Sequence, residues 1–110
     1  MKCDLRELDK LEAYLKEKNI PYERKRRYSP ELDAEFEKLP YGGWDGGEQI
    51  IVYDEKLNRQ WDAIIGYGSY GVSEGLLEVY GCPVVLNSDG DSVCGGLTAA
   101  DVIQRLDTNR

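Results

Sequence analysis

Two short stretches of the chain hold the residue types that suit ligand binding, and the first of them is YERKRRY. Alternation along a β-strand would place Tyr22, Arg24, Arg26 and Tyr28 on one face. Guanidinium groups bind phosphates and tyrosine rings stack on bases, so this face fits a nucleotide-derived ligand. The same cluster of charges would also protect an exposed edge strand from aggregation. The sequence leaves both interpretations open.

The second stretch, GYGSYG, lies between an apolar run and a polar segment. Its glycines resemble the G-x-G-x-x-G pattern of dinucleotide-binding folds, but such folds need a parallel βαβ unit, and the preceding strand is expected in a hairpin. Glu74 in the next turn would also oppose a bound anion. A looser role remains, in which Tyr67, Ser69 and Tyr70 line a pocket. Alternatively, the glycines only allow close packing of the backbone.

Catalytic chemistry has little support in the composition. The chain has no histidine, which excludes histidine-dependent nucleophiles and acid–base pairs. Cys82 precedes a proline in an acidic region, where a thiolate is disfavoured. Carboxylate pairs are abundant but carry no spacing signature, so a carboxylate-based hydrolase is kept only as an alternative. We therefore expect a protein that is not an enzyme.

Metal binding is not indicated either. Asn87, Asp89 and Asp91 alternate as they do at the start of a calcium loop. The pattern then requires glycine at its sixth position and glutamate at its twelfth, where this chain has Ser92 and Thr98. We expect neither a metal nor a cofactor.

The overall composition is that of a globular protein. The 110 residues are 41% hydrophobic and 32% charged, which fits a single domain over residues 1–110. There is no apolar run of roughly 18 residues and no hydrophobic segment of the signal-peptide kind, so we expect a cytoplasmic protein with no membrane association. Cys3, Cys82 and Cys94 are expected to be reduced thiols, although a disulfide between the last two stays open.

Charge is distributed unevenly along the chain. Residues 1–40 have ten basic and ten acidic side chains, whereas residues 41–110 have four basic and eleven acidic ones, for a net charge of −7. Such an acidic half disfavours sequence-specific or general binding to nucleic acid and leaves a basic protein as a second kind of partner. Its candidate surface is Asp45, Glu48, Asp54, Glu55, Asp89 and Asp91.

Leucines at helical spacing predict a first helix that begins with a capping-box-like pair, Asp4 and Glu7, and ends near Lys18 or Asn19, before Pro21. A strand is predicted over residues 20–29, followed by a loop with one or two helical turns after Ser29. Residues 50–53 and 61–65 form a hairpin joined by a polar turn, and the second of these runs is expected to be a central strand.

The last third of the chain is predicted to contain two helices. The first covers residues 73–81 with Ser73 as its cap, and the second covers residues 97–107 with Thr98 as its N-cap and Asp101 at the third helical position. Between them we expect a short strand or extended run over residues 82–86 and an exposed loop over residues 87–96. The fold class is α+β: an N-terminal helix, a small antiparallel sheet with a central hairpin and two C-terminal helices.

The segments WDAI, GSYG, EGLLE and LTAADVIxRL resemble parts of small uncharacterised proteins encoded by phages and prophages of Firmicutes. The resemblance covers roughly residues 61–106, and its elements are Trp61, Asp62, Gly68, Ser69, Tyr70, Gly71, Glu74, Gly75, Leu97, Thr98, Ala99 and Asp101. Small phage proteins often antagonise host defence by sequestering a nucleotide signal or by blocking a defence protein. The resemblance therefore implies a counter-defence role in the host-cell cytoplasm.

Together these features predict a non-enzymatic phage-type accessory protein that binds and sequesters a small nucleotide-derived signal as a homo-oligomer. The expected contacts are Tyr22, Arg24, Arg26 and Tyr28 on the basic strand and Tyr67, Ser69 and Tyr70 at the glycine-rich turn. The alternative is an acidic inhibitor of a host defence protein, comparable to anti-CRISPR proteins.

Overall fold

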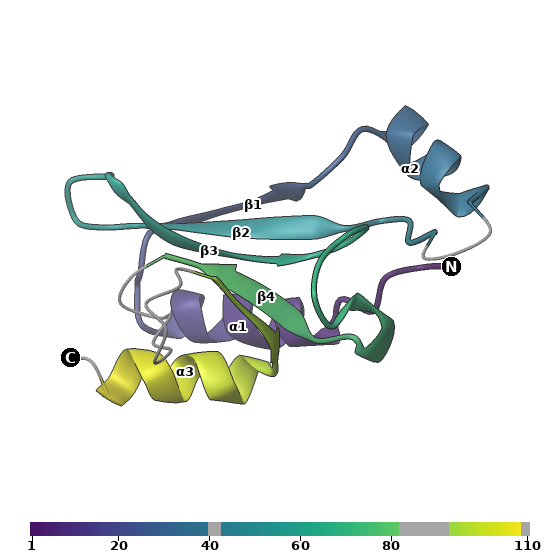
Figure 1. Ribbon diagram of the computed structural model, residues 1–110. Coiled ribbons are helices and arrows are strands. Elements are labelled where there is room, and N and C mark those ends of the chain that lie inside the picture. Colours follow the sequence, from purple (N-terminus) through teal and green to yellow (C-terminus); the bar gives the residue numbers. More distant parts are fainter. Residues whose placement is uncertain (40–42, 82–92, 109–110) are drawn as a thin grey trace.

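The computed structural model describes residues 1–39, 43–81 and 93–108. Within them the helices α1 and α3 lie together on one side of an antiparallel sheet, while the short helix α2 lies beyond one end of it (Figure 1). The α+β class is thereby confirmed. The elements in chain order are α1 (Arg6–Glu17), β1 (Tyr22–Arg26), α2 (Pro30–Glu37), β2 (Glu48–Tyr53), β3 (Arg59–Ile65), the 3-10 turn η1 (Val72–Glu74), β4 (Leu77–Tyr80), β5 (Val93–Leu97) and α3 (Ala99–Thr108).

The sheet is a meander whose strands follow one another in the order β1-β2-β3-β4-β5, with every neighbouring pair antiparallel. Side chains alternate between its two faces. The face that packs on α1 and α3 is called the inner face here, and the opposite one the outer face. In register, Val52 pairs with Tyr22 and Trp61 on the inner face, and Asp62 pairs with Ile51 and Tyr80 on the outer face.

The core lies between the inner face and the two helices. Leu8, Leu11 and Leu15 recur on one side of α1 and are all fully buried. They pack on the inner-face side chains of the central strands and on Val102 of α3. Burying one such side chain contributes about 1.5–3 kcal/mol, so this stripe is what holds α1 on the sheet. None of the helices within the described ranges is long and apolar enough to span a bilayer.

Two local predictions at helix starts are confirmed. Thr98 and Asp101 form a reciprocal capping box at α3, with the Asp101 N–H donating to Oγ1 of Thr98 at 3.1 Å and the Thr98 N–H donating to Oδ2 of Asp101 at 3.0 Å. The helical turns after Ser29 form α2, because the Ser29 hydroxyl accepts the Leu32 N–H at 3.2 Å and Pro30 occupies the first turn.

The predicted start of the first helix is wrong in detail. Leu5, without a side-chain hydrogen bond, is the N-cap of α1, and Asp4 accepts the Arg6 N–H from outside the helix. Glu7 does not complete a capping box. Its carboxylate instead accepts the Ala99 N–H at 2.8 Å and so caps α3 from a neighbouring helix.

The predicted helix over residues 73–81 is also wrong, and one C-terminal helix is present among the described residues where two were expected. Ser73 lies in the short turn η1, which is bounded by Gly71 and Gly75 at φ of 88° and 70°. The chain then extends as β4, because Leu77 and Val79 alternate into the core, with Leu77 paired to β5 and Val79 paired to both β3 and β5. Backbone pairing outweighs the local helical spacing of the leucines.

The predicted loop over residues 87–96 is wrong in its final part. Val93–Leu97 form the edge strand β5 although the segment contains two adjacent glycines. A Cβ atom on Gly95 would lie 2.3 Å from Cβ of Tyr70, so glycine is required here for close approach rather than for a turn. Residues 82–92, including the predicted extended run over 82–86, Asp89 and Asp91, lie outside the described residues.

Candidate functional site

The basic strand places Arg24 on the inner face, where three carboxylates surround its guanidinium. Nε lies 2.7 Å from Oε1 of Glu48, and Nη1 lies 2.8 Å from Oδ1 of Asp9 and 3.0 Å from Oε1 of Glu12. Burial works to lower the pKa of Arg24, but the hydrogen bonds to Glu48 and Asp9 outweigh it and raise that pKa. The cation therefore joins β1 to α1 and β2 and is already neutralised within the chain.

Tyr22 and Arg26 are also engaged by acidic side chains. The Tyr22 hydroxyl donates to Oε2 of Glu12 at 2.8 Å, and burial together with this bond raises the pKa of Tyr22. Arg26 contacts the buried carboxylate of Asp33 on α2. Both side chains are therefore held by carboxylates of the chain, although the Arg26 side chain stays 51% exposed.

Tyr28 and Tyr67 do come together, at the end of the sheet nearest α2. The Tyr67 carbonyl accepts from Nη1 of Arg27 at 3.0 Å and from the Tyr28 hydroxyl at 3.4 Å. The ring of Phe36 packs against both tyrosines, stacked on Tyr67 with centroids 4.2 Å apart and edge-on to Tyr28 at 4.9 Å. Packed rings thus fill the space in which a base was expected.

The remaining two predicted contacts are separate from this cluster. The buried Ser69 hydroxyl accepts the Gly66 N–H at 3.0 Å and donates to the Gly66 carbonyl at 2.8 Å, which closes the turn. The Tyr70 side chain is 72% exposed. The structure therefore joins Tyr28 and Tyr67 but does not gather the predicted contact residues around one hollow within the described ranges.

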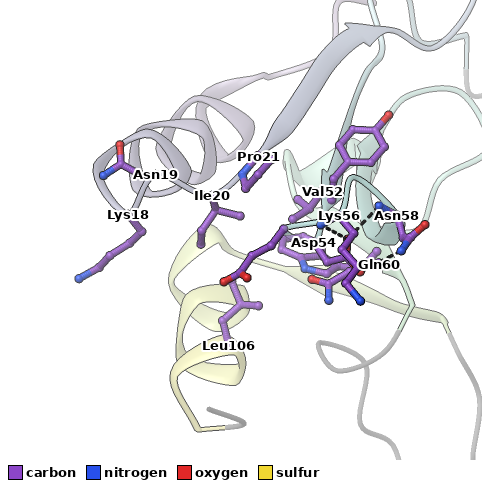
Figure 2. Close-up of a pocket in the computed structure, with 13 residues that line it drawn as sticks. Lys18, Asn19, Ile20, Pro21, Val52, Asp54, Lys56, Asn58, Gln60 and Leu106 are labelled. Carbon is purple, nitrogen blue, oxygen red and sulfur yellow. Dashed lines mark hydrogen bonds between the residues drawn. The ribbon is translucent and has the colours of Figure 1, made fainter.

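A pocket of about 740 Å³ lies at the opposite end of the sheet, beside the turn between β2 and β3. Figure 2 shows Ile20 and Leu106 on one side of it and Val52 and Gln60 on the other. Its lining residues come from three separate parts of the chain: Lys18, Asn19, Ile20, Pro21, Val52, Tyr53, Asp54, Glu55, Lys56, Asn58, Gln60, Trp61 and Leu106. This hollow is called the end pocket below.

The end pocket has an apolar floor and a polar rim. Trp61 is only 2% exposed and, with Val52, forms part of the floor. On the rim, Oδ1 of Asp54 accepts the N–H groups of Lys56 and Asn58 at 2.9 Å each, so this carboxylate holds the turn in place. The ammonium groups of Lys18 and Lys56 have no carboxylate partner among the described side chains, and Lys18 points away from the hollow in Figure 2.

Sequence reasoning missed the end pocket for a physical reason. Lys18 to Pro21 directly follow α1, residues 52–61 belong to the β2–β3 hairpin and Leu106 belongs to α3, and no local sequence pattern links these three segments. The one available signal was the polar turn between two β-rich runs, which predicts a hairpin and not a binding site.

Three of the acidic side chains considered for a basic partner make contacts within the chain. Asp45 contacts Lys2, Glu48 pairs with Arg24, and Asp54 organises its turn. Glu55 is exposed on the rim of the end pocket. Throughout the described ranges, no three carboxylate or thiolate side chains gather closely enough to hold a metal ion.

The described residues thus form an α+β fold with the end pocket at one end of its sheet. Comparisons of the chain with protein-family models, curated proteins and solved structures find no match.

Proposed function

We propose that this chain is a non-enzymatic binding protein that captures a small nucleotide-derived ligand in the end pocket. The observation that carries the proposal is a hollow of about 740 Å³ with an apolar floor, side-chain amides and a lysine that no described carboxylate neutralises. Its size falls within the range of small-molecule sites, roughly 300–1,000 Å³. The basic strand is not the proposed site, because carboxylates of the chain already bind Arg24 and Arg26.

Each part of the pocket suits one part of such a ligand. Ile20 and Leu106 offer aliphatic surface to the face of a base, and the amides of Asn58 and Gln60 can donate to and accept from its polar edge. The Lys56 ammonium supplies three donors and a positive charge for a phosphate. Asp54 is held by backbone N–H groups, which argues against its use as a catalytic base.

The resemblance to phage proteins supports a counter-defence setting for this capture. A protein that sequesters a host signal needs affinity and abundance but no turnover, and the chain has no histidine for acid–base chemistry. We therefore propose cyclic nucleotides and cyclic ADP-ribose isomers as the first ligands to test. The expected homo-oligomer remains a prediction, which the mass by light scattering would check.

Isothermal titration calorimetry with those ligands and with plain mononucleotides tests the proposal. At least one ligand should bind, and Lys56→Glu should weaken it by about tenfold, the usual effect of replacing one attractive charge contact. Lys25→Glu makes the same charge change on an exposed residue of β1 away from the pocket and should leave affinity within about twofold. Absence of heat with every ligand would overturn the proposal.

A further inference from the structure

The strand β1 forms one edge of the sheet, because β2 is its only strand neighbour in the described part of the chain. Its backbone bonds to β2 come from alternate residues, and the Arg27 N–H, which donates to the Gly47 carbonyl at 3.0 Å, shows which set this is. The N–H and C=O groups of Tyr22, Arg24 and Arg26 belong to the other set and point away from β2. They form an open edge with which a further strand can pair.

None of the described helices blocks the open edge. α1 packs against α3 and β3 on the inner side of the sheet, and α2 lies beyond the end of β1 rather than along it (Figure 1). The side chains of Glu23 and Lys25 point to the outer face and are exposed. A strand that approaches in the plane of the sheet therefore meets the backbone groups of β1 and these two charges.

The charges on β1 match a second copy of the same strand. Charged residues on an edge strand deter pairing with any strand that does not complement them. When two copies of β1 pair antiparallel about a two-fold axis at Arg24, Glu23 of each copy lies opposite Lys25 of the other copy. The two residues then form a non-hydrogen-bonded pair, in which facing side chains are closest to each other. In this register β1 is complementary to itself.

Other registers lose this match. A shift by one residue sets outward-pointing backbone groups against inward-pointing ones, and a shift by two residues places Glu23 opposite Glu23 or Lys25 opposite Lys25. In the matched register, Tyr22 lies opposite Arg26, whose side chain is 51% exposed and suits a contact with the ring. Arg24 faces its own copy, but three carboxylates of the same chain already bind each guanidinium and offset the repulsion.

We propose that this chain forms a symmetric dimer through β1, which joins two five-stranded sheets into one continuous sheet. The proposal assigns a surface to the expected homo-oligomer and does not depend on a ligand in the end pocket. Five residues span about 17 Å of strand, so the interface is small and the dimer is weak and forms at high protein concentration.

Sedimentation equilibrium between about 10 μM and about 1 mM protein tests the proposal with charge-swapped variants. Glu23→Lys and Lys25→Glu each create like-charged pairs at both symmetric positions and should weaken the dimer by at least about tenfold. An equimolar mixture of the two variants should form a heterodimer about as tight as the parent dimer, because every lysine then faces a glutamate. The two variants shift the net charge of −7 in opposite directions, so general repulsion does not explain a loss in both.

Glu74→Lys is the matched control, since it makes the same charge change as Glu23→Lys on an exposed residue of η1 and should leave the dimer as in the parent. Amide hydrogen exchange gives a second measurement. With rising protein concentration the N–H groups of Tyr22, Arg24 and Arg26 should exchange more slowly, whereas those of Glu23 and Lys25 bond to β2 in either state and should change little.

Three results would each refute the proposal: a monomeric mass at every concentration, a dimer that survives in either charge-swapped variant, or no heterodimer from their mixture. Slower exchange at Glu23 and Lys25 but not at Arg24 would also refute it, because the second copy would then not bond the open edge. The nucleotide titration tests the end pocket separately.

Discussion

The ring of Phe36 lies flat on the ring of Tyr67, with centroids 4.2 Å apart and planes inclined by 7°. This contact connects α2 to the turn after β3, two segments that are 31 positions apart in the chain. It also occupies the space between the basic strand and the glycine-rich turn. The basic strand and the glycine-rich turn, which most resemble ligand-binding motifs, are therefore brought together by side-chain packing.

Phe36→Ala should destabilise the protein by about 2 kcal/mol, because it removes two ring contacts and much of the half-buried surface of α2. Urea unfolding followed by tryptophan fluorescence measures this change. Leu32→Ala, on an exposed side chain of the same helix, should cost less than about 0.5 kcal/mol. Equal effects of the two variants would show that the stack does not hold α2.

Arg24→Met should lower the free energy of unfolding by about 1–3 kcal/mol, because it leaves Glu12 and Glu48 without their cation while keeping the aliphatic stem. Lys25→Met, on the exposed side of the same strand, should stay within about 0.5 kcal/mol of the parent. If Arg24→Met instead left stability intact and abolished nucleotide binding, the basic strand rather than the end pocket would be the ligand site.

Glu7 should make the protein less stable in acid. Its pKa is lowered from 4.5 in the folded state, first by the hydrogen bond from the Ala99 N–H and then by Lys10. The unfolded chain consequently binds this proton at higher pH than the folded protein does. The stability that Glu7 contributes is complete above pH 4.5 and is lost as the pH falls through the lower folded pKa.

Urea midpoints measured from roughly pH 7 down to pH 3 test this assignment. Glu7→Gln should lower the midpoint at neutral pH and flatten its decline in acid, because the glutamine has no proton to bind. Glu17→Gln, on an exposed residue of the same helix, should leave the decline of the urea midpoint in acid as in the parent. If the urea midpoint of Glu7→Gln declined in acid as steeply as that of the parent, a role for this carboxylate in capping α3 would be contradicted.

Leu57→Gly should stabilise the protein by roughly 0.5–1 kcal/mol, since Leu57 holds a left-handed φ of 63° at 70% exposure and a leucine there is strained. Thermal unfolding measures the gain. Lys56→Gly, one position earlier and without a positive φ, should destabilise, because glycine there only adds freedom to the unfolded chain. If Leu57→Gly and Lys56→Gly changed the stability in the same direction, the turn would not be strained at Leu57.

Local chemistry in the sequence predicts the parts of the fold that depend on neighbouring residues. Thr98 and Asp101 lie within one helical turn, so their capping box is visible in the sequence, and the same holds for Ser29 and Pro30 at the start of α2. β4 was not predictable in this way. Leu77 and Val79 belong to a strand because β3 and β5 offer backbone partners on both sides, and neither partner is near them in sequence.

The candidate site also depends on contacts between residues that are distant in the sequence. Nothing near Arg24 in the sequence indicates that Asp9, Glu12 and Glu48 will neutralise it, and nothing near Leu106 places it beside a hairpin. The chemical character of a residue is local, whereas its availability to a ligand depends on the side chains that the fold brings to it. For this reason the basic strand was the natural prediction and the end pocket could not be predicted.

The central claim, that a nucleotide-derived ligand enters the end pocket, is tested most directly by the two tryptophan indole resonances in one NMR titration. Trp61 forms the floor of the pocket, while Trp44 precedes the other end of β2. With the ligand selected by calorimetry, the Trp61 indole and the side-chain amides of Asn58 and Gln60 should shift to saturation while the Trp44 indole stays fixed. A titration in which the Trp44 indole and the amides around Tyr67 shift instead, with Trp61 unchanged, would contradict the claim.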